Sequence, residues 1–125
     1  MEEMLRYCGP VKHATERWAL EDLEIGGQRI RVGQMVLALL LSADRDEERF
    51  PDPDRFDITR SPNPHVGFGA AGPHFCLGAH LARREIRVML QELLTRVPQI
   101  RASGEPDRLL SSFINGIKHL PCELD

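Results

Sequence analysis

The stretch that decides the fold is Phe68-Gly-Ala-Ala-Gly-Pro-His-Phe-Cys-Leu-Gly78, a loop of small residues with a cysteine directly before a long helical pattern. Unpaired main-chain N–H groups and the positive end of a helix dipole favour the thiolate of a cysteine placed there. A thiolate is a nucleophile or a metal ligand. The glycines of the loop let a flat partner approach the main chain closely, and its two phenylalanines add apolar surface. The loop therefore predicts a site for a large planar cofactor at Cys76.

The rest of the chain predicts short elements around this loop. Apolar residues recur every three or four positions over 77–97, which predicts a helix ended by Pro98. Residues 2–7 predict a short helix. Further expectations are a hairpin turning at Gly26-Gly27, a buried strand passing into a short helix over 35–41, a functional loop over 50–75, and two or three short strands up to Leu124.

Length, charge and composition exclude several classes of protein. The 125 residues fit one domain, and a net charge of −3 provides no basic field for nucleic acid or an anionic membrane. The longest apolar run, Met35 to Leu41, is far short of the roughly 20 residues that span a bilayer. No secretory signal follows Met1, so we expect a cytoplasmic protein. Three widely spaced cysteines make a poor disulfide framework, and Cys8 and Cys122 are expected to be inert.

At the cysteine loop the sequence resembles a known family. The pattern Phe68-Gly-x-x-Gly-x-His-x-Cys-Leu-Gly-x-x-Leu-Ala-Arg-x-Glu85 is similar to the haem-binding loop and following helix of cytochrome P-450, the haem-thiolate monooxygenases. Glu3-Met-Leu-Arg6 resembles the Glu-x-x-Arg motif of that family, and Phe50-Pro-Asp-Pro-Asp-Arg-Phe-Asp57 resembles its meander. Residues 111–121 resemble its terminal hairpin. The motifs occur in the family's order and cover essentially the whole chain.

The resemblance implies the fold and the cofactor. The expected fold is α+β from a mainly helical family: the C-terminal part of the cytochrome P-450 fold, with residues 1–125 forming a partial single domain and no second domain. The implied cofactor is haem b, with Cys76 as the axial ligand of the iron. His74 and Arg17 match the positions that hold the haem propionates, and Phe68, Gly69 and Gly78 match positions around the ring and the sulfur.

The resemblance also implies residues outside the iron site. Glu3, Arg6 and Arg55 match a structural ion-pair network. Substrate contacts are implied for two segments, one that follows the first helix and one in the terminal hairpin, with the residues His13, Ala14, Phe113 and Ile114. Phe68 lies eight residues before Cys76, whereas the commonest family pattern has seven. This longer loop resembles a soluble bacterial-type subset, some of whose members oxidise sterols or branched lipids.

Other interpretations of these residues remain open. Cys76 could be a buried structural cysteine, and His74, Cys76 and His80 could ligate zinc, although structural zinc sites usually have four ligands. Arg17 could stack on Trp18 at the surface.

Two functions follow. The first is a monooxygenase that inserts one oxygen atom from O₂ into an organic or lipid-like substrate, with electrons from a ferredoxin-type donor. The second is a non-enzymatic, truncated haem-binding remnant. The family activates oxygen with an acid and alcohol pair on a long distal helix, and no such helix precedes Glu3.

Overall fold

The computed structural model describes residues 1–13 and 16–124, so Ala14 lies outside the described residues. The helices and strands follow one another in the order α1 (Glu2–Cys8), β1 (Arg17–Trp18), β2 (Leu23–Ile25), β3 (Gln28–Ile30), β4 (Met35–Val36), α2 (Leu40–Ala43), α3 (Ala79–Arg96), β5 (Arg101–Ala102), β6 (Asp107–Arg108), β7 (Ile117–His119) and β8 (Cys122–Glu123).

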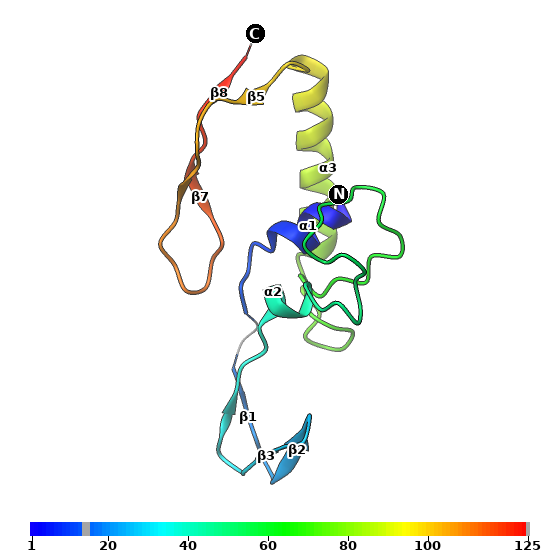
Figure 1. Cartoon of the computed structure of the whole chain (residues 1–125), viewed down its shortest axis with the longest axis vertical. Helices are drawn as coiled ribbons and strands as arrows, with labels where there is room; N and C mark the ends of the chain where they lie inside the picture. The colour runs from blue at the N-terminus through cyan, green and yellow to red at the C-terminus, as the bar shows by residue number, and fades with distance from the viewer. Residues whose placement is uncertain (14–15, 125) are drawn as a thin grey trace.

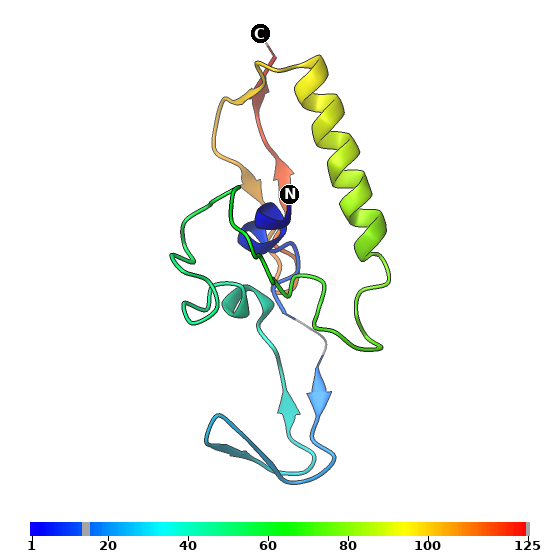
Figure 2. The same cartoon turned by 90° about the vertical axis from the view of Figure 1, so that its right-hand side faces the viewer.

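These elements form three regions along the long axis of the molecule. The hairpins of β1 to β4 lie at one end, and α3 stands beside the C-terminal strands at the other (Figures 1 and 2). The short helices α1 and α2 lie between these two ends, together with the irregular segment 44–78. The loop that carries Cys76 leaves this middle region and enters α3, so the cysteine lies where the regions meet.

Helix α1 lies in the middle region and ends as its sequence predicts. Gly9 has a φ of +42° and its N–H donates to the Leu5 carbonyl at 3.2 Å, a left-handed cap that only glycine adopts easily. The helix buries Glu3, Leu5 and Arg6. A seven-residue helix is marginal alone, so its stability comes from these tertiary contacts.

The strands form two-stranded antiparallel pairs in the part of the chain that the structure describes. The predicted hairpin is confirmed: Leu23 pairs with Ile30, and both Gly26 and Gly27 have positive φ. After Pro98 there are four short strands, one more than the two or three expected. Each of these strands is only two or three residues long, too short to give a distinct sequence pattern.

The apolar run over 35–41 forms the predicted strand and short helix but does not form a core. Only Leu40 of this run is buried, whereas Met35 is 54% exposed and Leu39 is 56% exposed. Apolar patterning predicted burial, but the hairpin region projects away from the packed middle of the molecule (Figure 1). The expectation of a buried strand there is wrong.

Segment 44–78 contains no described helix or strand, in agreement with the expected loop over 50–75. Side chains fix its path over α1. Asp44, 1% exposed, accepts the Val66 N–H at 2.7 Å, and its carbonyl accepts a hydrogen bond from Arg6 at 2.6 Å. Burial raises the pKa of the Asp44 carboxyl. One buried aspartate therefore attaches the segment to α1 through its main-chain carbonyl and joins the two ends of the segment through its side chain.

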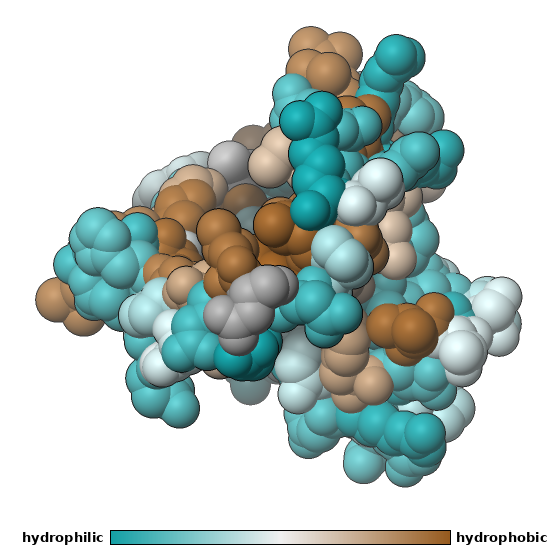
Figure 3. Space-filling model, turned by 90° about the horizontal axis from the view of Figure 1, so that it is seen from above, coloured by the Kyte–Doolittle hydropathy of each residue, from teal (hydrophilic) through white to brown (hydrophobic). Residues whose placement is uncertain are grey.

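Helix α3 has 18 residues, as predicted within two residues at its start, but only its first residue, Ala79, is buried. Its apolar positions are exposed, for example Met89 at 70% and Leu94 at 58%. Apolar side chains also gather in the hollow of the face seen from above (Figure 3). No helix in the described part of the chain is long and apolar enough to cross a membrane.

Candidate haem site

The cysteine loop is held open by main-chain hydrogen bonds at both ends. The Gly69 N–H donates to the Val66 carbonyl at 2.7 Å, and Gly69 has a φ of +84°, which a residue with a side chain adopts only with strain. The Cys76 N–H donates to the Phe68 carbonyl at 3.0 Å, and the Cys76 carbonyl accepts the Ala79 N–H at 3.1 Å. The sequence therefore leads Cys76 directly into the first turn of α3, with the cysteine itself exposed.

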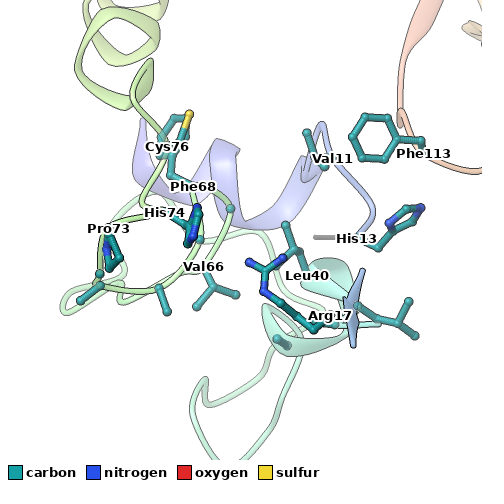
Figure 4. A pocket seen from close by; sticks show the side chains of 18 residues that line it. Val11, His13, Arg17, Leu40, Val66, Phe68, Pro73, His74, Cys76 and Phe113 are labelled. Atoms are coloured by element: carbon teal, nitrogen blue, oxygen red, sulfur yellow. The ribbon is translucent and has the colours of Figure 1, made fainter. Parts of the chain in front are cut away.

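This loop forms one wall of a cavity of about 810 Å³. The cavity is lined by residues from four parts of the molecule: the segment from Val11 to Arg17, the region from Ala38 into α2, the end of segment 44–78 with the cysteine loop, and Phe113 of the terminal hairpin. Figure 4 shows Cys76, Phe68 and His74 on the loop side, and His13 and Phe113 on the other side. The structure therefore brings residues more than 60 positions apart in sequence around one space.

Both residues expected to hold carboxylates line this cavity. Arg17 lies on β1 and His74 lies in the cysteine loop, and both residues are exposed. Arg17 donates to the carbonyl of Glu16 at 3.3 Å. The remaining lining is mainly apolar and includes Leu40 and Val66. The result is an apolar space with two basic side chains along it, which suits a flat apolar group with acidic substituents.

The glycines predicted beside the cysteine have different surroundings. A Cβ built on Gly78 would lie 3.8 Å from the Cys76 sulfur, in ordinary van der Waals contact. A Cβ on Gly69 would lie 3.9 Å from the His74 carbonyl oxygen. Glycine at 78 thus leaves the sulfur uncovered on that side, whereas glycine at 69 is needed chiefly for its positive φ.

Of the expected substrate contacts, His13 and Phe113 line the cavity with their rings 5.1 Å apart. Ile114 pairs with Val11 in an isolated antiparallel bridge and is not among the lining residues. Main-chain bonds fix this arrangement, since the Lys12 N–H donates to the Phe113 carbonyl at 2.9 Å. The terminal hairpin is thus joined to the segment after α1.

The ion-pair network needs one correction. Arg6, fully buried, donates two bonds of 2.8 Å to the carboxylate of Glu3. The guanidinium that joins them is that of Arg60, whose Nε lies 3.3 Å from a Glu3 oxygen, whereas Arg55 contributes its main-chain carbonyl. The prediction that the Arg55 side chain completes the ion-pair network is therefore wrong. The sequence offered two arginines near together in the meander, and only the path of the loop selects between them.

Arg6 and its neighbours also set the protonation of Glu3. The bidentate hydrogen bond from Arg6 lowers the pKa of Glu3 to about 2, although burial opposes this effect. The Asp57 N–H and the Asn63 side chain donate to the same carboxylate at 3.0 Å each. Glu3 therefore holds α1, the meander and the approach to the cysteine loop together as a charged group.

The sequence analysis did not identify a second cluster, formed by Glu2, His65 and Arg83. Glu2 accepts hydrogen bonds from Arg83 at 2.9 to 3.1 Å and lies 3.0 Å from His65. The bond from Arg83 is the main reason that the pKa of Glu2 is lowered. Arg83 was part of the quoted helix motif, but nothing in the sequence indicated which acidic residue it would meet.

The zinc interpretation finds no geometric support. Across residues 1–13 and 16–124, no three His, Cys, Asp or Glu side chains are grouped so that they could hold a metal ion. His80 is exposed on α3, one residue beyond its start. A site with one thiolate ligand, as in haem ligation, does not require such a cluster.

Comparison with known proteins agrees with this geometry. Residues 1–106 match the family model for cytochrome P-450. The chain is 50% identical over 121 residues to the methyl-branched lipid omega-hydroxylase of Mycobacterium tuberculosis. The matched residues make up 97% of this chain and 28% of that protein. The chain is 48% identical over 118 residues to the steroid C26-monooxygenase of Mycolicibacterium smegmatis, covering 94% of the chain and 27% of that enzyme.

A solved structure gives the same result. The cytochrome P-450 of Mycobacterium marinum in complex with pseudoionone has a TM-score of 0.92 and 47% identity, covering 97% of this chain and 29% of that one. The chain thus spans less than a third of the length of these relatives. The family model, the relatives and the shared fold together show that the chain belongs to the cytochrome P-450 family, whose cofactor is haem.

Proposed function

We propose that residues 1–125 are the haem-binding part of a haem-thiolate monooxygenase, a partial single domain in which Cys76 is the axial ligand of the iron. One observation carries the proposal: the exposed Cys76 lies on the wall of a cavity of about 810 Å³ lined largely by apolar residues. Its loop is fixed by main-chain bonds rather than by the thiol, which leaves the sulfur available to a ligand.

The lining residues fit a haem. Protoporphyrin is flat and apolar with two carboxylates, and the cavity combines apolar walls with Arg17 and His74. Arg17 can form two charge-assisted hydrogen bonds with a carboxylate, and the imidazole of His74 can donate one. Because Gly78 has no side chain, the Cys76 sulfur is not covered from that direction. Cofactor binding by these residues accordingly explains why two exposed basic groups border an apolar space.

A haem held there would supply the activation of O₂, with one oxygen atom passing to the substrate as a hydroxyl group and the other to water, using two electrons and two protons. This chain would contribute the thiolate of Cys76, the propionate contacts of Arg17 and His74, and part of the substrate wall. Phe113 and His13, whose rings lie 5.1 Å apart, would border the substrate.

A lipid-like substrate is supported by two observations. The relatives named above are a hydroxylase of methyl-branched lipids and a monooxygenase of steroids. The cavity lining is mainly apolar, with Leu40 and Phe113 on the side away from the cysteine loop. We therefore propose a branched lipid or a sterol as the substrate class and O₂ as the co-substrate.

The proposed electron donor is an acidic, ferredoxin-type protein. Helix α3 begins next to Cys76 and carries the exposed arginines Arg84 and Arg87. Opposite charges at a protein surface speed association and orient the partner. Replacing both arginines with glutamine should slow reduction more at low salt than at high salt.

The decisive experiment is the spectrum of the reduced, carbon-monoxide-bound protein after addition of haem. Thiolate ligation predicts a strongly red-shifted Soret band that is lost in Cys76→Ala and kept in Cys8→Ser, a matched change at another exposed cysteine. A Soret band unchanged by Cys76→Ala would overturn the proposed ligand.

The same preparation separates the two candidate functions. Substrate hydroxylation supported by a ferredoxin and its reductase would establish the enzyme. A red-shifted complex that consumes no O₂ and gives no hydroxylated product under the same conditions would establish the non-enzymatic haem-binding chain.

A further inference from the structure

A guanidinium lies against the aromatic ring next to the proposed iron ligand. The Arg83 Cζ lies 4.6 Å from the centroid of the Phe68 ring, within the range of a cation–π contact. Arg83 comes from the second turn of α3, whereas Phe68 comes from the start of the cysteine loop. This contact therefore closes the loop against the helix that the loop itself begins.

Glu2 orients the guanidinium by accepting hydrogen bonds along one edge of it. Its Nε lies 3.1 Å from each oxygen of Glu2, and its terminal nitrogen lies 2.9 Å from one of them. Arg83 and Glu2 are 28% and 37% exposed at their side chains, so water screens the pair only partly. With its donors directed at Glu2, the guanidinium places its Cζ over the Phe68 ring, 4.6 Å from the ring centroid.

His65 fixes Glu2 in turn. The Gly67 N–H donates to Nδ1 of His65 at 3.2 Å, which assigns the proton of the imidazole to Nε2. Nε2 then donates to Glu2 at 3.0 Å, and the His65 side chain is only 2% exposed. A Cβ on Gly67 would lie 3.2 Å from this Nδ1, so glycine is needed for the approach. The cluster is thus built from α1, segment 44–78 and α3.

Phe68 connects this cluster to the sulfur. The Phe68 carbonyl accepts the Cys76 N–H at 3.0 Å, and both residues line the cavity (Figure 4). The stacked guanidinium holds the Phe68 ring, and the Phe68 main chain holds the Cys76 main chain. Phe68 therefore takes part in both contacts, through its ring with Arg83 and through its carbonyl with the Cys76 amide.

We propose that Arg83 is a positioning residue for the thiolate: stacked on Phe68 and oriented by Glu2 and His65, it fixes the loop that presents Cys76 to the iron. This inference rests on the proposed role of Cys76, but the contact itself exists without the cofactor. It also separates Arg83 from its exposed neighbour Arg84, which has no such contact and can serve a docking partner.

The first test measures hydrogen exchange of the Cys76 amide in the 125-residue chain without haem. Arg83→Met keeps a long side chain but removes the charge and the flat group, and we expect the Cys76 amide to exchange about tenfold faster. Arg83→Lys keeps the charge for Glu2 but cannot stack, so it should fold and give an intermediate rate. The control Arg84→Met should change the rate less than about twofold.

A double-mutant cycle distinguishes positioning from a simple tether between α1 and α3. Phe68→Leu keeps apolar volume but removes the aromatic face, and it should reproduce the faster exchange at Cys76. Both changes remove the same contact between Arg83 and Phe68. The Cys76 amide should therefore exchange no faster in the double variant than in Phe68→Leu alone. The proposal would be overturned if the rate increases of the two single variants multiplied in the double variant. It would also be overturned if amides of α1 exchanged faster while the Cys76 amide did not change.

A second measurement follows the loop in the haem-bound chain. Arg83→Met should lower the fraction of carbon-monoxide complex that has the red-shifted Soret band, and Arg84→Met should not. Equal fractions in both variants would overturn the link to the sulfur. Complete absence of haem binding would instead overturn the proposed function, and the amide exchange rates would still decide whether Arg83 positions the loop.

Discussion

At the residue scale, the buried ion pair of Glu3 and Arg6 joins separate segments of the packed middle region. Arg6 is fully buried, and its donors reach the Glu3 carboxylate and the main-chain carbonyls of the irregular segment. Removal of one partner from such a pair leaves an uncompensated charge away from water. Among the described residues the packed middle region therefore includes buried charged side chains as well as apolar ones.

We predict that Glu3→Gln lowers the free energy of unfolding by about 3 kcal/mol, because the guanidinium of Arg6 stays buried without its counter-charge. Urea titration followed by circular dichroism measures the change. The matched control is Glu92→Gln, which breaks the exposed pair of Glu92 and Arg96, 2.8 Å apart. That loss should be below about 0.5 kcal/mol. Similar losses in the two variants would contradict the prediction.

The same carboxylate predicts a pH dependence of stability. The pKa of Glu3 is lowered from 4.5 to about 2 in the folded chain, so its contribution is fully present above pH 4.5 and is lost as the pH falls toward 2. Unfolding free energy measured between pH 6 and pH 2 should decline through this window. In Glu3→Gln that part of the decline should disappear. An unchanged profile in the variant would show that other carboxyl groups carry the effect.

At the element scale, the end of α1 depends on one glycine for two separate reasons. Gly9 has a left-handed φ, and a Cβ there would collide with the side chain of Leu41 in α2. Gly33 has a φ of +81° with nothing within 4 Å of its Cβ position. The two glycines therefore share the backbone strain but not the collision.

Gly33→Ala should cost about 1 to 2 kcal/mol from backbone strain alone, and Gly9→Ala should cost more, because Leu41 must also move. Thermal and urea unfolding of the two variants give the comparison directly. Equal losses at both positions would mean that α1 and α2 tolerate the displacement of Leu41, and that the helix end is set by backbone conformation only.

Elements defined by local pattern were predictable, and elements defined by packing were not. The helix over 79–96 and the hairpin at Gly26 and Gly27 follow from periodicity and turn residues close together in sequence. The prediction that residues 35–41 are buried was wrong. An apolar run favours burial, but burial requires another part of the chain to pack against it. The additional C-terminal strand was not predicted because the strands after Pro98 are only two or three residues long, too short to give a distinct pattern.

At the scale of the whole molecule, the cavity is the place where all regions meet. A ligand that binds only the folded chain stabilises it in proportion to the logarithm of its concentration. Haem at 100 times its dissociation constant should raise the free energy of unfolding by about 2.7 kcal/mol. The measurement is urea unfolding at increasing haem concentration.

Arg17→Gln should weaken haem binding and so reduce this stabilisation, because one propionate loses its charged partner. The control is Arg29→Gln, since Arg29 forms an exposed pair with Asp22 on the hairpin and is not among the residues that line the cavity. Equal stabilisation by haem in both variants would contradict the role proposed for Arg17.

The sequence by itself determined the family, the position of Cys76 before α3, and the residue types along the cavity, because these depend on neighbours within a few positions of one another. Only the tertiary structure decided that Arg60 and not Arg55 pairs with Glu3, and that Arg83 meets Glu2 and Phe68. Those partners lie 57 to 81 residues apart, or on opposite sides of the loop. Their contacts depend on the path of segment 44–78, which has no helix or strand whose period could reveal it.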